Sequence, residues 1–269
     1  MLAAIVKEVS MSLNKKQISL GIGELSKELS ITVYKKTDST NTQAKLIAER
    51  GEVEKAIFIA SEQTAGRGRL GRSFTSNKGK GLYLSILLGK ELPADFGTSL
   101  TTYMAVIATR AIAQLTAIDP KIKWVNDIYA GGKKLAGILT EGKAKSESTL
   151  AYAVVGIGIN LLHQEFPDDV KAIATTVEDE CGAKVDVNEL TALIVKEFFD
   201  NLHLVGTTEL ADEYRYRSFL IGERVNVIKP TTTYEATVKG ITDKCELQLE
   251  LADGSEEILS TGEVSVRKI

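Results

Sequence analysis

Apolar and polar residues alternate along much of the chain in runs with the two-residue period of a β-strand. The run from Ile31 to Lys36 alternates in this way, and the later runs are apolar enough for buried strands. Gly131 and Gly132 separate two of the runs and predict a tight hairpin turn. The predicted strands of this part are ITVYKK, KAIFIASE, GLYLSILLG, KIKWVNDIYA, KKLAGILTEG and TLAYAVVGIGINL.

Other segments have the spacing of amphipathic helices. Residues 98–118 place apolar side chains at positions 100, 103, 104, 107, 111 and 115, which form one helical stripe. Residues 186–203 share this spacing and begin with a capping-box pattern. Residues 38–51 predict a helix that starts with polar capping residues and ends at a glycine. We expect a short helix at ELSKEL, residues 24–29, and a loop at 161–187.

After Leu220 the pattern changes to short, closely spaced strands. They are ERVNVIK, YEATVKG, ELQLELADGSEEIL and VSVRKI, with a hairpin turn at Asp253-Gly254. About fifty such residues are the size of a small closed β-barrel. We therefore expect an α+β (mixed α/β) fold with an N-terminal extension at 1–30, a large mixed-sheet domain flanked by helices at 31–219, and a C-terminal SH3-like β-barrel at 220–269.

Composition and charge exclude several kinds of partner. The 269 residues carry a net charge of −3, which argues against nucleic-acid binding through bulk positive charge. There is no apolar run of membrane-spanning length and no signal-peptide pattern. Cys181 and Cys245 lack metal-ligand spacing, which fits inert thiols in a reducing cytoplasm. With only His163 and His203 present, a zinc site or a Ser-His-Asp triad is not expected.

The stretch GRGRLGRS, residues 66–73, matches two phosphate-binding motifs at once. Its glycines have the Gly-x-Gly-x-x-Gly spacing of dinucleotide sites, and its ends differ from a P-loop at one residue. Both motifs require a helix directly after the loop, whereas the turn-forming stretch SFTSNKGKG leaves no room for one. What remains is a loop with Arg67, Arg69 and Arg72, whose planar donor groups suit phosphate or carboxylate oxygens. The alternative is a solvated basic surface loop.

This loop also resembles the adenylate-binding loop of biotin protein ligases, GRGRxGR. Further signatures of that family follow in order: DSTN at 38–41, Gln63, KWVND at 123–127, KLAGI at 134–138 and GIGIN at 156–160. The resemblance extends from about Ile31 to the C-terminus. Two positions depart from the family pattern, which usually has proline at Val125 and often tryptophan at Phe74. We expect Val125 to affect backbone geometry only, and Phe74 to keep an aromatic contact.

The resemblance implies an ATP-dependent ligase in its monofunctional form, without an N-terminal DNA-binding domain. Such an enzyme activates biotin with ATP to biotinyl-5'-AMP and pyrophosphate. It then transfers biotin to a lysine of a biotin carboxyl carrier protein or domain, as in acetyl-CoA carboxylase. Mg²⁺ would arrive on the ATP phosphates, so no dedicated metal site is expected. No nucleic acid or membrane is implied as a partner, and exposed sheet edges near the site would allow a homodimer.

The resemblance also assigns roles to individual residues. The catalytic residues are Lys134, Arg69 and Asp127. Biotin would be bound by Ser39, Thr40, Asn41, Gln63, Gly66, Arg67, Gly68, Arg69, Lys134 and Gly137. The adenylate would be bound by Arg67, Arg69, Arg72, Phe74, Asn126, Asp127, Lys134 and Asn160.

Each assignment has a structural alternative. Lys134 fits an exposed hairpin lysine, and Asp127, Asn126 and Asn160 fit turn residues. Ser39 and Thr40 fit helix caps, although a helix start is itself a cluster of donors and can serve both purposes. On local sequence alone these alternatives stay open.

Three other functions compete with the biotin ligase. A lipoate or octanoate protein ligase has the same fold and acyl-adenylate chemistry, but does not require DSTN together with GRGRxGR. A biotin-dependent DNA-binding repressor needs a helix-turn-helix, for which residues 1–30 are too short and too weakly patterned. A non-catalytic adaptor would not need both Lys134 and Asp127.

Overall fold

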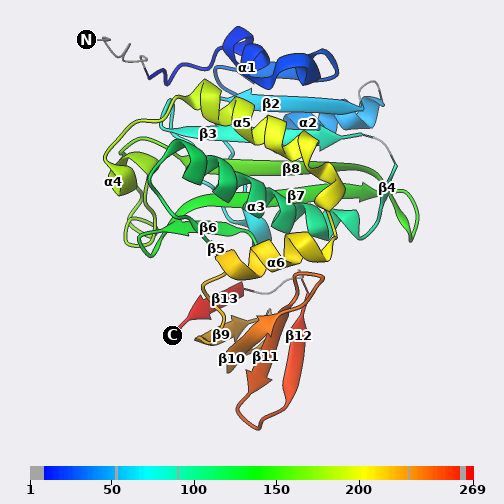
Figure 1. The fold of residues 1–269 in the computed structure, drawn as a ribbon, viewed down its shortest axis with the longest axis vertical. Coiled ribbons are helices and arrows are strands. Elements are labelled where there is room, and N and C mark those ends of the chain that lie inside the picture. Colours follow the sequence, from blue (N-terminus) through cyan, green and yellow to red (C-terminus); the bar gives the residue numbers. More distant parts are fainter. Residues whose placement is uncertain (1–8, 52–53, 90, 230, 261–264) are drawn as a thin grey trace.

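The chain is built around two separate β-sheets (Figure 1). The computed structural model describes residues 9–51, 54–89, 91–229, 231–260 and 265–269. The larger sheet has the strand order β1-β2-β3-β8-β7-β6-β5, with β4 paired to β8, and the smaller one the order β12-β11-β10-β9-β13. A mixed α+β fold with a large and a small sheet is therefore confirmed.

The larger sheet is mixed because β1 pairs with β2 in parallel and the other neighbours are antiparallel. In the β7–β8 pair, Gly137 lies directly opposite Gly158. The strands are β1 Ser30–Tyr34, β2 Lys55–Ala60, β3 Gly81–Leu88, β4 Leu92–Pro93, β5 Lys121–Lys123, β6 Asp127–Ala130, β7 Lys133–Ala144 and β8 Thr149–Asn160.

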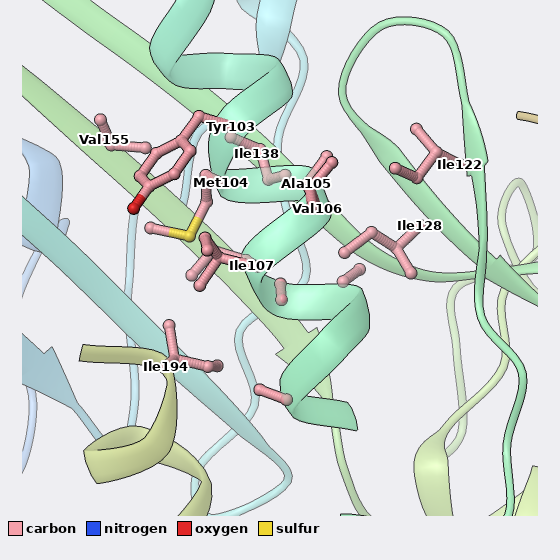
Figure 2. Packing of buried hydrophobic residues seen from close by; sticks show 14 of the residues in the cluster. Tyr103, Met104, Ala105, Val106, Ile107, Ile122, Ile128, Ile138, Val155 and Ile194 are labelled. Carbon is pink, nitrogen blue, oxygen red and sulfur yellow. The ribbon is translucent and has the colours of Figure 1, made fainter. Parts of the chain in front are cut away.

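Helices cover both faces of this sheet. On one face, Ala44 of α2 packs in a small cluster with Phe58 and Val154 of the strands. On the other face, α3 packs on β7 and β8 and on α5, as Met104, Ile107 and Ile194 show in Figure 2. The helices are α1 Lys15–Ile22, α2 Thr40–Arg50, α3 Phe96–Leu115, α4 Val177–Cys181, α5 Val187–Asp200 and α6 Thr208–Arg217, with 3-10 turns η1 Gly23–Lys27, η2 Arg69–Gly71 and η3 Leu202–Leu204.

Several expected elements are confirmed and others differ. Asp186 caps α5 by accepting from the amides of Asn188 and Glu189, as expected. The hairpin between β6 and β7 turns at Gly131 and Gly132, both with positive φ.

Two expectations were wrong in detail. KIKWVNDIYA forms two strands, β5 and β6, because the chain turns between them, where the Trp124–Val125 peptide is cis. The 161–187 segment, expected to be a loop, contains α4. The short helix expected at ELSKEL is present as the 3-10 turn η1.

The C-terminal sheet is antiparallel and small, as expected, but a closed barrel is not detected among the described residues. Its strands are β9 Arg224–Ile228, β10 Thr233–Ile241, β11 Leu247–Leu251, β12 Glu256–Leu259 and β13 Ser265–Lys268. There, β12 pairs only with β11 and β13 only with β9, so the two ends of the strand path do not meet. Alternation predicts strands and their inward positions, but it carries no information on closure.

Residues 9–29 pack against the larger domain through α1, while residues 1–8 of the expected extension lie outside the described residues. Ile18 is fully buried against α5, and Asn14 caps α1 by accepting from two backbone amides. The Asn14 amide in turn donates to Asn188 of α5 at 2.7 Å. Within 9–29 the only helices are α1 and η1, so no helix-turn-helix occurs there. None of the helices in the described ranges is long and apolar enough to cross a bilayer.

We expect Ile18→Ala to lower the free energy of unfolding by about 2–5 kcal/mol, because it opens a cavity between α1 and α5. Urea denaturation would measure the change. Leu20→Ala in the same helix is the control, since Leu20 is 72% exposed and should change stability little. Equal effects of the two substitutions would contradict packing of α1 on α5.

Candidate active site

A cavity of about 860 Å³ lies at one face of the larger sheet. Its walls come from β7 and β8, the start of α2, the Gly/Arg loop (residues 66–73) and the segment 169–173. Phe219 and Val266, from later in the chain, complete the lining. Predicted site residues that line it are Ser39, Thr40, Asn41, Gln63, Arg67, Gly68, Arg69, Arg72, Phe74, Asn126, Asp127, Lys134 and Gly137. Motifs spread from residue 39 to residue 137 are thus brought together around one space.

Glycines leave the sheet bare on the floor of this cavity. A Cβ at Gly158 would lie 2.5 Å from the Phe74 ring, and one at Gly137 would lie 3.4 Å from it. A Cβ at Gly156 would overlap the Asn41 side chain. Since no side chain can be added here without moving a neighbour, the glycines of GIGIN provide the room in which Phe74 and Asn41 lie close to β8.

The start of α2 is capped by the Gln63 side chain rather than by Ser39 at the N-cap position. Oε1 of Gln63 accepts from the backbone amide and the hydroxyl of Thr40 at 2.8 and 3.1 Å. Ser39 occupies the N-cap position but makes no side-chain capping hydrogen bond. The Ser85 hydroxyl, buried on β3, lies within hydrogen-bond distance of Thr40 and Asn41. The Ser39 hydroxyl is therefore not a helix cap, and Ser39 is one of the residues that line the cavity.

Lys134 and Asp127 form an ion pair across the β6–β7 hairpin, with Lys134 Nζ 2.6 Å from Asp127 Oδ1. The Lys134 backbone is held on its other side by the segment after β8, where its amide donates to Ile173 at 2.7 Å. The Lys134 side chain is 29% exposed and lines the cavity, whereas the neighbouring Lys133 is exposed. Lys134 is thus not a freely exposed hairpin lysine.

The Gly/Arg loop turns back on itself without a following helix, as predicted. Phe74 donates its amide to Gly66, and Gly68 donates its amide to Arg72, so the loop is closed by its own backbone. Arg69 Nη1 donates to Asn126 Oδ1 at 3.2 Å. Burial lowers the pKa of Arg69, which the charge of Asp127 partly offsets. Its guanidinium is therefore held in the cleft beside a carboxylate.

Two predicted residues, Gly66 and Asn160, do not line the cavity. A Cβ at Gly66 would lie 2.5 Å from the Phe74 carbonyl, so this glycine permits the loop to close. Asn160 is 4% exposed, and its amide donates to the Thr175 carbonyl at 3.1 Å. Direct ligand contacts from these two residues stay predictions, and here both support neighbouring backbone.

Some cavity residues were missed by the sequence prediction. The rings of Tyr129 and Phe219 lie 5.3 Å apart, and Lys123 Nζ lies 5.5 Å from the Tyr129 ring. Burial, with the charge of Asp127, raises the pKa of Tyr129 to about 12. Lys123 belongs to the KWVND motif, but nothing in the sequence pattern links Phe219 or Val266 to the other cavity residues, which end at Ile173.

The described residues contain no group of three or more His, Cys, Asp or Glu side chains placed to hold a metal ion. Two carboxylates, Asp127 and Asp169, line the cavity. Mg²⁺ usually keeps several waters and takes one or two protein carboxylates together with substrate phosphates. The residues present therefore fit a Mg²⁺ ion that is brought in by a nucleotide.

Clustered arginines and a lysine in one cleft place fixed positive charge where an anionic ligand can bind. Comparisons with known proteins agree. Residues 33–160 match the biotin/lipoate A/B protein ligase family, and residues 220–267 match the C-terminal domain of biotin protein ligases. The chain belongs to the biotin protein ligase family.

Individual relatives support this assignment. The chain is 33% identical over 230 residues to the bifunctional ligase/repressor BirA of Bacillus subtilis. The aligned region covers 82% of this chain and 70% of the relative. It is 30% identical to the biotin--[acetyl-CoA-carboxylase] ligase of Mycobacterium tuberculosis, covering 87% and 88% of the two chains. The structure of the Aquifex aeolicus biotin protein ligase in complex with biotin and ATP superposes with a TM-score of 0.76 at 28% identity, covering 89% and 99%.

We expect Gly158→Ala to displace the Phe74 ring and to raise the Kd for ATP about tenfold, because the added methyl occupies the position of the ring. Equilibrium dialysis would measure binding. Gly97→Ala is the control, since its methyl would meet only the end of the Leu150 side chain, at 3.3 Å. An unchanged Kd in Gly158→Ala would show that the bare floor is not part of the nucleotide site.

Proposed function

We propose that this biotin protein ligase uses the cavity to join biotin to the α-phosphate of ATP and then passes biotin to a carrier lysine. The observation that carries the proposal is the convergence of Lys134, Arg67 and Arg69 on a cavity that also has apolar and aromatic walls. Two anions, a carboxylate and a triphosphate, repel each other until fixed positive charge is placed between them. This cavity supplies that charge.

In the first step a biotin carboxylate oxygen bonds to the α-phosphorus. The bond from this phosphorus to the oxygen bridging the α- and β-phosphates breaks, and pyrophosphate leaves with the electron pair. Lys134 and Arg69 stand at the junction of carboxylate and phosphate and stabilise the charge that develops there. Asp127, 2.6 Å from Lys134, holds the ammonium in place. Magnesium bound to ATP would neutralise part of the phosphate charge.

The biotin ring system lies against the start of α2 in this proposal. Ser39, Thr40, Asn41 and Gln63 offer hydroxyl and amide groups to the ureido ring, and the Ser39 hydroxyl is not used for capping. Arg67 and Gly68 approach from the Gly/Arg loop. The bare backbone at Gly137 allows the valeryl chain to lie close to the sheet.

The adenylate lies towards the aromatic end of the cavity. Phe74 offers a ring face, and Arg72 and Asn126 offer donors. Tyr129 and Phe219 extend this wall. Gly66 and Asn160 contribute by holding the loop and the end of β8 in place.

In the second step the amine of a carrier lysine attacks the carbonyl of biotinyl-AMP. The carbon–nitrogen bond forms, the carbon–oxygen bond to phosphate breaks, and AMP leaves. Asp127 is placed to orient the incoming amine and to accept its proton. The acceptor is a biotin carboxyl carrier protein or domain, in line with the names of relatives such as the M. tuberculosis ligase.

We expect Lys134→Ala to lower the rate of biotinyl-AMP formation by at least about a hundredfold, because one fixed charge at the phosphate is lost. Mass spectrometry of quenched mixtures of protein, biotin, ATP and Mg²⁺ would measure the product. Lys133→Ala is the matched control and should keep the wild-type rate, since Lys133 is exposed.

Lipoate and octanoate run in parallel with biotin in the same experiment. Adenylate formed from either of these acids, but not from biotin, would reassign the substrate. Absence of any adenylate from the wild type would exclude the proposed reaction altogether.

We further propose that the second half of β7 forms a homodimer interface beside the active site. Strand β6 pairs only with Lys133–Gly137, whereas β8 pairs with β7 as far as Ala144. From Thr140 onward, one edge of β7 therefore has no partner strand among the described residues. Such an edge can accept a strand from a second copy.

The free thiols Cys181 and Cys245 fit the proposed location in the cytoplasm.

We expect Thr140→Pro to raise the dimer dissociation constant at least about tenfold, because proline removes a backbone donor at the open edge yet is tolerated on edge strands. Sedimentation velocity with biotin and ATP present would measure it. Glu147→Pro, in the exposed turn after β7, serves as the control. A dimer that survives Thr140→Pro, or a wild type that stays monomeric, would contradict this interface.

A further inference from the structure

Glu141 on β7 is the meeting point of three elements. Its Oε1 pairs with Lys45 Nζ of α2 at 2.7 Å. Its Oε2 accepts from Asn41 Nδ2 of α2 at 3.0 Å and pairs with Arg67 of the Gly/Arg loop at 2.6 Å. One carboxylate thus connects the strand, the start of α2 and the Gly/Arg loop.

The carboxylate itself lies beside the cavity and is not part of its wall. Arg67 and Asn41 line the cavity, whereas Glu141 and Lys45 do not. Glu141 therefore meets the cavity through the two side chains that it holds. The proposed function gives it no role.

Side chains join the Gly/Arg loop to the sheet. Its backbone hydrogen bonds, from Gly68 to Arg72 and from Phe74 to Gly66, are internal to the loop and do not fix it to the sheet. Arg69 reaches Asn126 on one side, and Arg67 reaches Glu141 on the other. Glu141 is thus one of the anchors that join the loop to the strand beneath it.

The charges around Glu141 allow Arg67 to leave this carboxylate for a ligand anion. Burial raises the pKa of Glu141, but hydrogen bonds from Lys45 and Asn41 and the charge of Arg67 outweigh burial, so the pKa lies below its ordinary value. The side chain stays ionised at neutral pH with two cations on one carboxylate. If Arg67 turns to a ligand anion, Lys45 and Asn41 still compensate Glu141, and no bare charge is left behind.

We propose that Glu141 is a positioning residue that holds Arg67 and Asn41 at the cavity before ligand binds, with Lys45 balancing it so that Arg67 can be released to an incoming carboxylate. The inference rests on the proposed role of Arg67 in biotin binding. Glu141 and Lys45 then have opposite effects. Glu141 holds the loop through Arg67, and Lys45 weakens that hold.

The test compares Glu141→Gln and Lys45→Met in the full chain. For Glu141→Gln we expect the KM for biotin, measured by pyrophosphate release, to rise about fivefold, which is the contribution of one partly exposed ion pair. The kcat should stay within about twofold of the wild-type value. Trypsin should cleave the ligand-free variant faster than wild type at Arg67, Arg69 and Arg72. Lys45→Met should also raise the KM, because Glu141 then keeps Arg67, but should slow cleavage instead.

A double-mutant cycle shows whether Glu141 acts through Arg67. Glu141→Gln should change the KM less in an Arg67→Ala background than in the wild type. Glu250→Gln, in the surface pair with Lys239 on the other sheet, is the control for loss of any carboxylate and should alter neither KM nor cleavage.

Three outcomes would overturn the inference: a fall in kcat with unchanged KM, fully additive effects of Glu141→Gln and Arg67→Ala, or faster cleavage in both single variants. If the wild type makes no biotinyl-AMP, the proposed function fails. The cleavage rates of the ligand-free variants still test the hold of Glu141 on the loop in that case.

Discussion

The pairing of β7 with β8 is the constraint on which the site depends. In this register Gly137 faces Gly158, so two neighbouring strands lack side chains at the same level of the sheet. The Phe74 ring occupies this gap. Two residues away along β8, the Asn41 side chain occupies the space next to Gly156. A shift of one residue would place Ile157 or Ile159 at this level and fill the cavity with aliphatic side chains.

The same register places the charged groups. Lys134 and Asp127 meet because β6 continues the sheet next to β7, and Glu141 lies on the cavity-side face of β7, further along the strand from Gly137. The arginines come from outside the sheet, on the Gly/Arg loop. Rigid strands therefore carry the carboxylates and the lysine, and a loop carries the arginines. This division suits a site whose ligands must enter before the charges close around them.

Much of this arrangement could be predicted from the sequence, because it depends on local signals. The Gly-Gly turn, the alternating strands and the Asp186 cap are each written in a few adjacent residues, and the ordered motifs named most of the cavity lining. Contacts between distant segments could not be predicted. Capping of α2 by Gln63, the burial of α1 against α5 and the wall formed by Phe219 each depend on tertiary packing that no local pattern encodes. Strand patterns likewise could not show that the C-terminal sheet stays open in the described residues.

The position of Val266 in the cavity wall has a consequence for biosynthesis. Ser39 and Val266 line the same cavity, but the ribosome makes Val266 long after the larger sheet can leave the exit tunnel. During translation the strands, the Gly/Arg loop and Lys134 can assemble while the part of the wall formed by Val266 is still missing. The growing chain thus carries the charged groups early, but the wall of the cavity is complete only when β13 has folded.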